Sequence, residues 1–206
     1  MTKHDRTGKR MNDLIINEPK FVEVSKREQT LKDDVPEYLD RTEIHQIFYS
    51  IPKEKHRELM LLAFLWNTGV RISEAITIKK GNIDFNTKNI KILWLKRRKL
   101  MTRALPINDK FAYSLATYTG GMNKDDLLFP FTRQRADQIC KKYNFVLNKD
   151  LHCHLFRHSF AVNYLKQTND IVGLKTLLGH QNITNTLIYA KIVNADIREK
   201  LNSIEF

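Results

Sequence analysis

The segment from Leu59 to Trp66 constrains the fold most strongly, because every residue in it is apolar. A helix that is apolar on nearly all sides is stable only when other elements pack around it. We therefore predict a central helix from about Lys53 to Thr68, with Gly69 as its C-terminal cap. The run is also too short to span a lipid bilayer, so we expect no membrane-spanning helix and hence no membrane partner of that kind.

Further helices are expected on both sides of this central helix. Asp40 followed by Glu43 has the pattern of a capping box and predicts a helix with Ile44 and Ile47 on its buried face. A short helix is expected to start near Arg71. In the second half of the chain, apolar periodicity predicts helices at about 133–147, 154–167, 171–178, 184–190 and 194–203.

Between the two helical regions the pattern changes to that of strands. Asn89–Leu95 is rich in β-branched and aromatic residues, Arg103–Ile107 is a second short run, and Lys96–Thr102 joins them. This arrangement predicts a small antiparallel hairpin. Asp126–Phe131 could add another extended piece. The predicted fold class is therefore mainly α with a small antiparallel β-sheet (α+β).

The formal net charge of +12 at pH 7 is unevenly distributed along the chain. Residues 1–37 contain as many acidic as basic residues and are interpreted as an N-terminal arm or linker, so the whole excess lies in residues 38–206. This excess favours a polyanionic partner, first a nucleic acid and second an acidic membrane surface; a basic protein without such a partner is the alternative. Two cysteines, Cys140 and Cys153, and no secretory signal favour a reduced, cytoplasmic location.

Several polar residues have the chemistry needed to bind a phosphate. His154 and Arg157 are three residues apart and share one face of a helix, with His158 close to both. A guanidinium binds two phosphate oxygens in a fork geometry that lysine does not reproduce. Arg71 directly follows the predicted central helix and could bind the same anion. The alternatives are a surface His–Arg pair and a local ion pair between Arg71 and Glu74.

Two residues near the C-terminus extend this set. His180 follows Gly179 at the predicted end of a helix, and Tyr189 lies further along the chain. Free tyrosine has a pKa of about 10 and needs a base or positive charge nearby to act as a nucleophile. The alternatives are a capping histidine and a half-buried core tyrosine.

The link of the predicted hairpin is strongly basic. Its cations are Lys96, Arg97, Arg98, Lys99 and, shortly after, Arg103. Such a hairpin is typical of contacts with a DNA backbone. One of its lysines could instead act as a general acid that protonates a leaving oxygen.

A zinc site is the competing interpretation of the histidines. The potential ligands are His152, Cys153, His154 and His158. Only one of them is a cysteine, and no second ligand pair follows at the spacing of zinc motifs. We therefore expect no metal and no other cofactor.

Taken in order, these residues resemble the phage-integrase-type tyrosine recombinases, which include the Xer-type proteins. LAFLWNTGVRISEAITIKKGNIDF is similar to the family's first box, and HCHLFRHSFAVNYL with LLGHQNITNTLIYA is similar to its second. The resemblance covers residues 38–206, which correspond to the catalytic domain. It implies the following catalytic residues: Arg71, His154, Arg157, His180 and the nucleophile Tyr189.

The same resemblance places the family's catalytic lysine in the basic hairpin. Counting from Arg71 favours Lys96, and Lys99 is the alternative. Most such recombinases also have an N-terminal helical domain that helps to enclose DNA, and residues 1–37 are too few for it. The chain is thus expected to be either a small single-domain recombinase or a piece of a longer protein.

The resemblance implies a site-specific recombinase that cleaves and rejoins double-stranded DNA through a 3′-phosphotyrosyl intermediate, without metal or ATP. Arg71 and Arg157 would hold the phosphate oxygens. His154 and His180 would hydrogen-bond the phosphate, with His154 as proton acceptor, and Lys96 would protonate the leaving 5′ oxygen. A homotetramer on two duplexes and a nucleoid-associated location are implied. The alternatives are an enzyme that only nicks and religates DNA, like a type IB topoisomerase, and a non-catalytic DNA-binding regulator.

Overall fold

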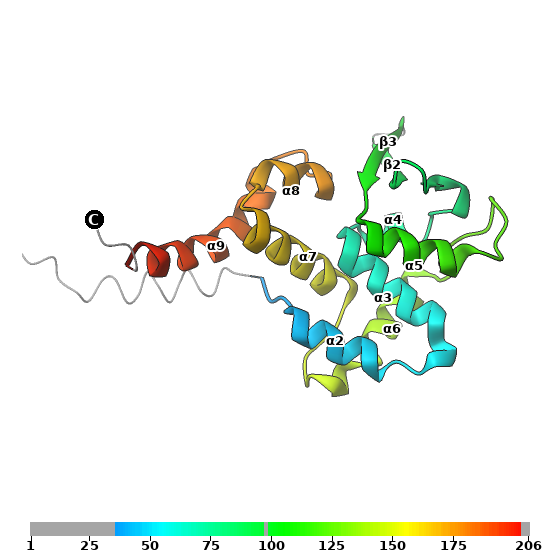
Figure 1. The fold of residues 1–206 in the computed structure, drawn as a ribbon, viewed down its shortest axis with the longest axis horizontal. Coiled ribbons are helices and arrows are strands. Elements are labelled where there is room, and N and C mark those ends of the chain that lie inside the picture. The colour runs from blue at the N-terminus through cyan, green and yellow to red at the C-terminus, as the bar shows by residue number, and fades with distance from the viewer. Residues whose placement is uncertain (1–35, 97–98, 203–206) are drawn as a thin grey trace, which may run out of the picture. The chain divides into compact units, whose positions relative to one another are not determined.

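The predicted central helix is α3 (His56–Thr68) in the computed structural model, and a mainly helical domain packs around it (Figure 1). The structure describes residues 36–96 and 99–202, without the side chains of 95–96, 99–100 and 192–200. The arm or linker expected at residues 1–37 therefore lies almost entirely outside the described residues. Leu61, Leu62 and Phe64 of α3 are fully buried, which is why so apolar a helix is stable here.

The helix before α3 begins with the predicted capping box. α2 (Arg41–Ser50) starts after Asp40, whose carboxylate accepts a hydrogen bond from the Glu43 backbone N–H at 2.8 Å. The Glu43 carboxylate in turn accepts a hydrogen bond from the Asp40 backbone N–H at 2.9 Å. Ile44 and Ile47 are buried, so the predicted apolar face is confirmed.

Two short elements flank α3. Lys53–Lys55 forms a separate 3-10 turn (η2) after Pro52, so α3 begins at His56 and not at Lys53 as predicted. α4 (Ile72–Ala75) is the short helix expected near Arg71, which occupies its N-cap position.

The sheet has three antiparallel strands in the order β1 (Ile83–Asp84), β2 (Asn89–Lys96) and β3 (Lys99–Pro106). β2 and β3 form the predicted hairpin, whereas β1 is absent from the prediction. The expected bounds of the second strand are wrong, because cross-strand pairing runs from Asn89 with Pro106 to Lys96 with Lys99. Backbone hydrogen bonding to β2 thus extends β3 through most of the predicted link, beyond the part that its apolar pattern marks.

The segment after the sheet also differs from the prediction. α5 (Asp109–Thr119) is not among the expected helices, although Asn108 caps it by accepting a hydrogen bond from the Phe111 N–H at 2.9 Å. Phe111 and Leu115 are buried four residues apart, which is a helical signal. Of the extended piece expected at Asp126–Phe131, the described residues contain a single bridge between Lys79 and Leu127.

The C-terminal half contains four helices among the described residues: α6 (Arg133–Lys141), α7 (Cys153–Thr168), α8 (Ile171–Leu178) and α9 (Thr184–Asn202). α7 and α8 agree with the prediction. The helix expected at 133–147 is wrong, because it is divided into α6 and a 3-10 turn, η4 (Asn144–Val146). The two helices expected at 184–190 and 194–203 are one continuous helix, since no glycine or proline interrupts the segment between them.

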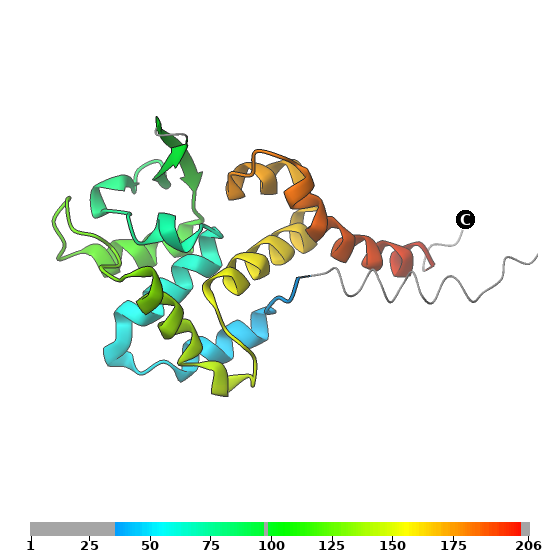
Figure 2. The same ribbon diagram turned by 180° about the vertical axis from the view of Figure 1, so that it is seen from behind.

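α7 joins the two hydrophobic cores of the domain. α7 packs against α3 and also against α8 and α9, and α9 leads away from the rest of the domain (Figure 2). The smaller core lies at this second contact and consists of Ala161, Val162, Leu165, Leu174, Leu178 and Tyr189. Tyr189 is only 2% exposed and therefore anchors the start of α9.

Replacing Gly69 by alanine is expected to lower the free energy of unfolding by roughly 2–4 kcal/mol. Gly69 caps α3 with a φ of 60°, and a Cβ at this position would lie 2.3 Å from Cδ1 of Phe160 on α7. Both the backbone conformation and the contact between α3 and α7 therefore require glycine. Urea unfolding measures the effect, with Gly121→Ala as control because a Cβ there meets nothing within 4 Å. Equal stability of both variants would contradict the prediction.

Candidate active site

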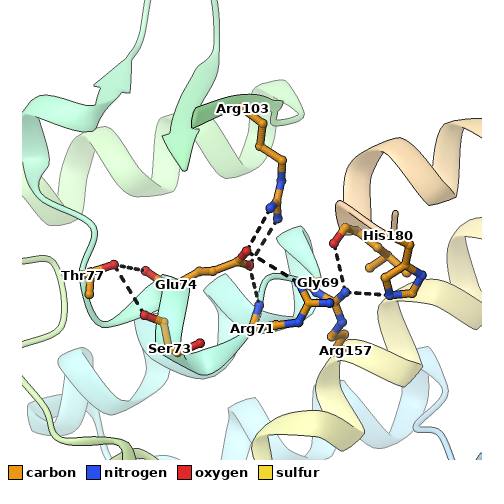
Figure 3. A network of polar contacts seen from close by, with 9 residues as sticks. Gly69, Arg71, Ser73, Glu74, Thr77, Arg103, Arg157 and His180 are labelled. Carbon is orange, nitrogen blue, oxygen red and sulfur yellow. Dashed lines mark hydrogen bonds and ion pairs between the residues drawn. The ribbon is translucent and has the colours of Figure 1, made fainter. Parts of the chain in front are cut away.

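The guanidinium of Arg157 lies at the centre of the site and is almost completely buried, with 4% of the residue exposed. Its Nη1 donates to the Gly69 carbonyl at 2.6 Å, and its Nη2 donates to the Leu178 carbonyl at 3.0 Å (Figure 3). Nη2 also lies 2.9 Å from Nε2 of His180. Two segments distant in sequence, at the ends of α3 and α8, therefore hold one cation in a single orientation.

The local folds of α3 and α8 explain why these carbonyls face a cation. Gly69 and Gly179 are the left-handed C-caps of the two helices, so each helix ends where its last carbonyls have no helical partner. The C-terminus of a helix carries partial negative charge. Burial and, second, the charge of Arg71 lower the pKa of Arg157 to about 10, so the guanidinium stays charged at neutral pH.

His180 has both ring nitrogens engaged. Nδ1 lies 3.0 Å from Oγ1 of the buried Thr186, and Nε2 faces Arg157. Because an arginine only donates, Nε2 must accept, which places the ring proton on Nδ1. Burial, and then the positive charges led by Arg157, lower the pKa of His180 to about 4. His180 is therefore neutral at pH 7 and holds Arg157 in place.

Glu74 on α4 is the buried anion of the site. Its carboxylate accepts two hydrogen bonds from Arg103, at 2.9 and 3.2 Å, and one from the Arg71 backbone N–H at 2.9 Å (Figure 3). Burial opposes ionisation of this carboxyl, but the hydrogen bonds from Arg103 and from the Arg71 backbone outweigh it and lower the pKa of Glu74. A single carboxylate thus joins β3 to the beginning of α4.

The two remaining arginines of the site, Arg103 and Arg71, differ in how far their side chains are exposed to solvent. The Arg103 side chain is 13% exposed, is paired with Glu74, and lies over the Trp94 ring with Cζ 5.4 Å from the ring centroid. It is therefore not the free surface cation that the sequence suggested. The Arg71 side chain is 43% exposed, and its Nη1 lies 3.8 Å from the Glu74 carboxylate. The local ion pair between Arg71 and Glu74 exists, but it leaves the Arg71 guanidinium accessible.

Tyr189 and His158 form a direct contact between α9 and α7. The Tyr189 hydroxyl lies 2.8 Å from Nδ1 of His158, and the two ring centroids are 5.7 Å apart. Burial raises the pKa of Tyr189, and the charges of Arg157 and Arg71 oppose that rise. The structure therefore places this tyrosine within the electrostatic field of both arginines.

His154 occupies an open position on the same face of α7. It is exposed, and its ring centroid lies 6.3 Å from that of His158. Among the side chains that the structure describes, that of His154 has no hydrogen-bond partner. Partial desolvation and then the charge of Arg157 lower the pKa of His154.

The hairpin is described only in part. The backbones of Lys96 and Lys99 are paired at the end of the ladder, whereas Arg97 and Arg98 lie outside the described residues. Both lysines that the sequence suggested as the general acid therefore lie at the end of the hairpin ladder.

The residues that suggested a zinc site lie at the beginning of α7. Among the described side chains, no group of three or more His, Cys, Asp and Glu residues is arranged to hold a metal. His152 instead caps α7, with its Nδ1 accepting from the Leu155 N–H at 3.2 Å. Cys140 and Cys153 are buried free thiols with their Sγ atoms 3.6 Å apart.

No helix in the described part of the chain is long and apolar enough to cross a membrane.

Stability is expected to fall as the pH decreases from about 6.5 to about 4.5. His158 and His180 both have a pKa lowered to about 4, compared with the ordinary value of 6.5. A lowered pKa means that the folded state favours the neutral ring, so its contribution is complete above pH 6.5 and is lost as the pH falls toward 4. We expect a loss on the order of 1 kcal/mol for each histidine after solvent screening.

Urea unfolding at several pH values measures this dependence. A His158→Asn variant should have a shallower slope, whereas His45→Asn, on the exposed side of α2, should retain the full slope. A free energy of unfolding that is constant between pH 7 and pH 5 would contradict the expected dependence.

Reasoning from the sequence missed two parts of this site. His158 appears there only as a neighbour and a possible zinc ligand, and Glu74 only as a partner of Arg71. Helical spacing placed His158 close to His154, but no local signal indicated its contact with Tyr189 of α9. No sequence signal pairs Glu74 with Arg103, because the two are brought together by packing of the hairpin on α4.

Comparison with known proteins agrees with this fold and identifies the family. Residues 37–195 match the model of the phage integrase family. The chain is 30% identical over 184 residues to tyrosine recombinase XerA of Thermococcus onnurineus, over 83% of this chain and 64% of XerA. The chain therefore spans slightly less than two thirds of the length of this relative.

Solved structures show the same fold. The crystal structure of XerA recombinase has a TM-score of 0.69 at 22% identity, covering 84% of this chain and 67% of XerA. XerH site-specific recombinase bound to its difH substrate has a TM-score of 0.62 at 21% identity, covering 79% of this chain and 52% of XerH. Because the family model matches residues 37–195, which are most of the chain, the chain belongs to the phage integrase family.

Proposed function

We propose that this protein cleaves and rejoins double-stranded DNA at a specific site, with Tyr189 as nucleophile and a 3′-phosphotyrosyl intermediate. The observation that carries the proposal is that the Tyr189 hydroxyl contacts His158 of α7, the helix that also carries the buried Arg157. The charges of Arg157 and Arg71 also oppose the rise in the pKa of Tyr189 that burial causes. Membership of the phage integrase family supports this class of reaction. The solved complex of XerH with its difH substrate supports DNA as the partner.

The two arginines have complementary roles in this proposal. The accessible guanidinium of Arg71 binds a non-bridging oxygen of the scissile phosphate. Arg157, held by two carbonyls and His180, presents its charge in a fixed position. Cations that are already in place stabilise the charge of the transition state without reorganisation.

The other residues act on protons and on the phosphate. The exposed His154 hydrogen-bonds a phosphate oxygen, and Lys96 of the hairpin, with Lys99 as the alternative, protonates the leaving 5′ oxygen. His180 acts chiefly by orienting Arg157, because its Nε2 is already occupied. It reaches the phosphate only if that contact opens. Arg97, Arg98 and Lys99 contact the DNA backbone, whereas Arg103 is committed to Glu74.

This chemistry needs neither a metal nor ATP. Two guanidiniums neutralise the phosphate charge, and the phosphotyrosyl bond conserves the energy of the broken phosphodiester. Attack by the free 5′ hydroxyl of a partner strand then reverses the reaction. Exchange between two duplexes requires four such sites, so we propose a homotetramer on DNA, in the cytoplasm at the nucleoid.

Covalent capture tests the proposal. A library of nicked duplexes with randomised central sequence is incubated with the protein, and DNA attached to protein in denaturing gels is sequenced. We expect enrichment of one sequence and, after addition of a 5′-hydroxyl partner strand, recombinant product. An adduct that yields only religated starting DNA would indicate nicking and religation without exchange. DNA binding without any adduct would indicate a regulator and contradict the proposed catalysis.

A further inference from the structure

We propose that His158 is the base that accepts the phenolic proton of Tyr189, an assignment that rests on the proposed role of Tyr189 as nucleophile. The hydroxyl of Tyr189 lies 2.8 Å from Nδ1 of His158. This is hydrogen-bond distance, at which a base can take the proton of a reacting group directly. Among the described residues, the Tyr189 hydroxyl has no other hydrogen-bond partner.

The direction of this hydrogen bond follows from the protonation states. Tyrosine is protonated at neutral pH and donates its O–H, so Nδ1 of His158 accepts and the ring proton lies on Nε2. The charged or titratable groups that act on His158 are His154, His152 and Arg157 of α7, together with Tyr189 of α9. Burial and then the charges of His154, His152 and Arg157 lower the pKa of His158 to about 4, which keeps the ring neutral before substrate binds.

A bound phosphodiester would convert this weak base into a stronger one. Its negative charge, placed between Arg71 and Arg157, offsets the positive field that disfavours protonation of His158. An anion near a histidine raises its pKa, and a base is most effective when its pKa approaches the working pH. Activation of the nucleophile is thereby coupled to occupation of the phosphate site.

The other two histidines of the site are less suited to this task. His154, which the family resemblance suggests as the proton acceptor, makes no hydrogen bond to Tyr189 in the described part of the chain. His180 has Nε2 occupied by Arg157 and Nδ1 by Thr186. His158 alone among the three histidines contacts the proposed nucleophile.

The proposed step conserves atoms and charge. As the phenolic oxygen of Tyr189 forms its bond to phosphorus, its proton moves to Nδ1 of His158. The bond between phosphorus and the 5′ oxygen breaks, and this oxygen takes a proton from the general acid, which is Lys96 in the proposal above. In the reverse attack, His158 returns its proton to the tyrosine.

A His158→Asn variant separates proton transfer from positioning. The Asn amide oxygen can accept the tyrosine hydrogen bond near the position of Nδ1, but it is not a base. On the captured DNA, we expect adduct formation by His158→Asn to be slower by about 100-fold or more at pH 7. Its rate should rise by about tenfold per pH unit up to pH 9, because Tyr189 must then ionise without assistance. The wild-type rate should be nearly constant from pH 6.5 to 8, and His45→Asn should behave like wild type.

Two outcomes would overturn the assignment. A wild-type rate for His158→Asn would exclude a role in the reaction, and a slow rate with the wild-type pH profile would mean that His158 only positions Tyr189. If wild type forms an adduct that Tyr189→Phe lacks, either outcome removes the His158 assignment and leaves the proposed function intact. If wild type forms no adduct on any library member, the proposed function and the His158 assignment both fail.

A measurement without DNA provides an independent check of the contact. In protein labelled with ¹⁵N-histidine, we expect the His158 Nδ1 resonance of wild type to show an accepted hydrogen bond at pH 7 and to shift in Tyr189→Phe. Absence of a shift would overturn the assignment even if His158→Asn were poorly folded.

Discussion

Replacement of Tyr189 by phenylalanine is expected to reduce covalent capture of DNA by at least about 10⁴-fold, because the variant has no atom that can form the phosphotyrosyl bond. The ring remains in the smaller core, so the fold should persist. Loss of one hydroxyl leaves Nδ1 of His158 without its partner and should cost about 1 kcal/mol of unfolding free energy. DNA affinity should remain close to that of wild type.

Denaturing gels measure the adduct, and mobility-shift titrations measure binding of intact DNA. Tyr113→Phe is the matched control, because Tyr113 on α5 is 77% exposed and lies outside the site. An adduct that persists in Tyr189→Phe would show that another residue is the nucleophile.

Arg157→Lys is expected to lose cleavage by about 10²-fold or more and to lower the free energy of unfolding by roughly 2–4 kcal/mol. The guanidinium binds Gly69, Leu178 and His180 through two separate nitrogens. An ammonium is a single point charge and does not span these acceptors, so buried carbonyls lose their donor. Binding of uncleaved DNA should be nearly unaffected, because the protein retains its other surface cations.

Arg71→Lys is the control that separates catalysis from stability. Its side chain is largely accessible, so we expect a similar loss of cleavage but a change of less than about 0.5 kcal/mol in unfolding free energy. Urea unfolding and single-turnover cleavage measure the two effects. Equal stability of Arg157→Lys and wild type would mean that the buried contacts of Arg157 do not support the fold. Equal loss of DNA binding and of cleavage would mean that Arg157 acts only in binding.

Helical and strand periods predicted most elements, because the residues that begin, continue and end these elements lie close together in the sequence. The capping box at Asp40, the glycine caps of α3 and α8, and the period of α7 are all encoded within one or two turns. α5 was missed although its cap and its apolar spacing are local signals. The bounds of the second strand, in contrast, were wrong because a distant contact decides them. β3 is longer than its apolar pattern because β2 pairs with it.

The sequence by itself determined which chemical groups are present and in what order: Arg71, the His154–Arg157 pair, His180 and Tyr189. These residues lie in short motifs whose spacing a helix or a cap converts directly into position. Only the tertiary structure decided which groups touch. Arg157 contacts His180, 23 positions away, and Gly69, 88 positions away. Glu74 contacts Arg103, 29 positions away, and His158 contacts Tyr189, 31 positions away. No local period encodes such contacts, because they depend on how whole helices and a hairpin pack against one another.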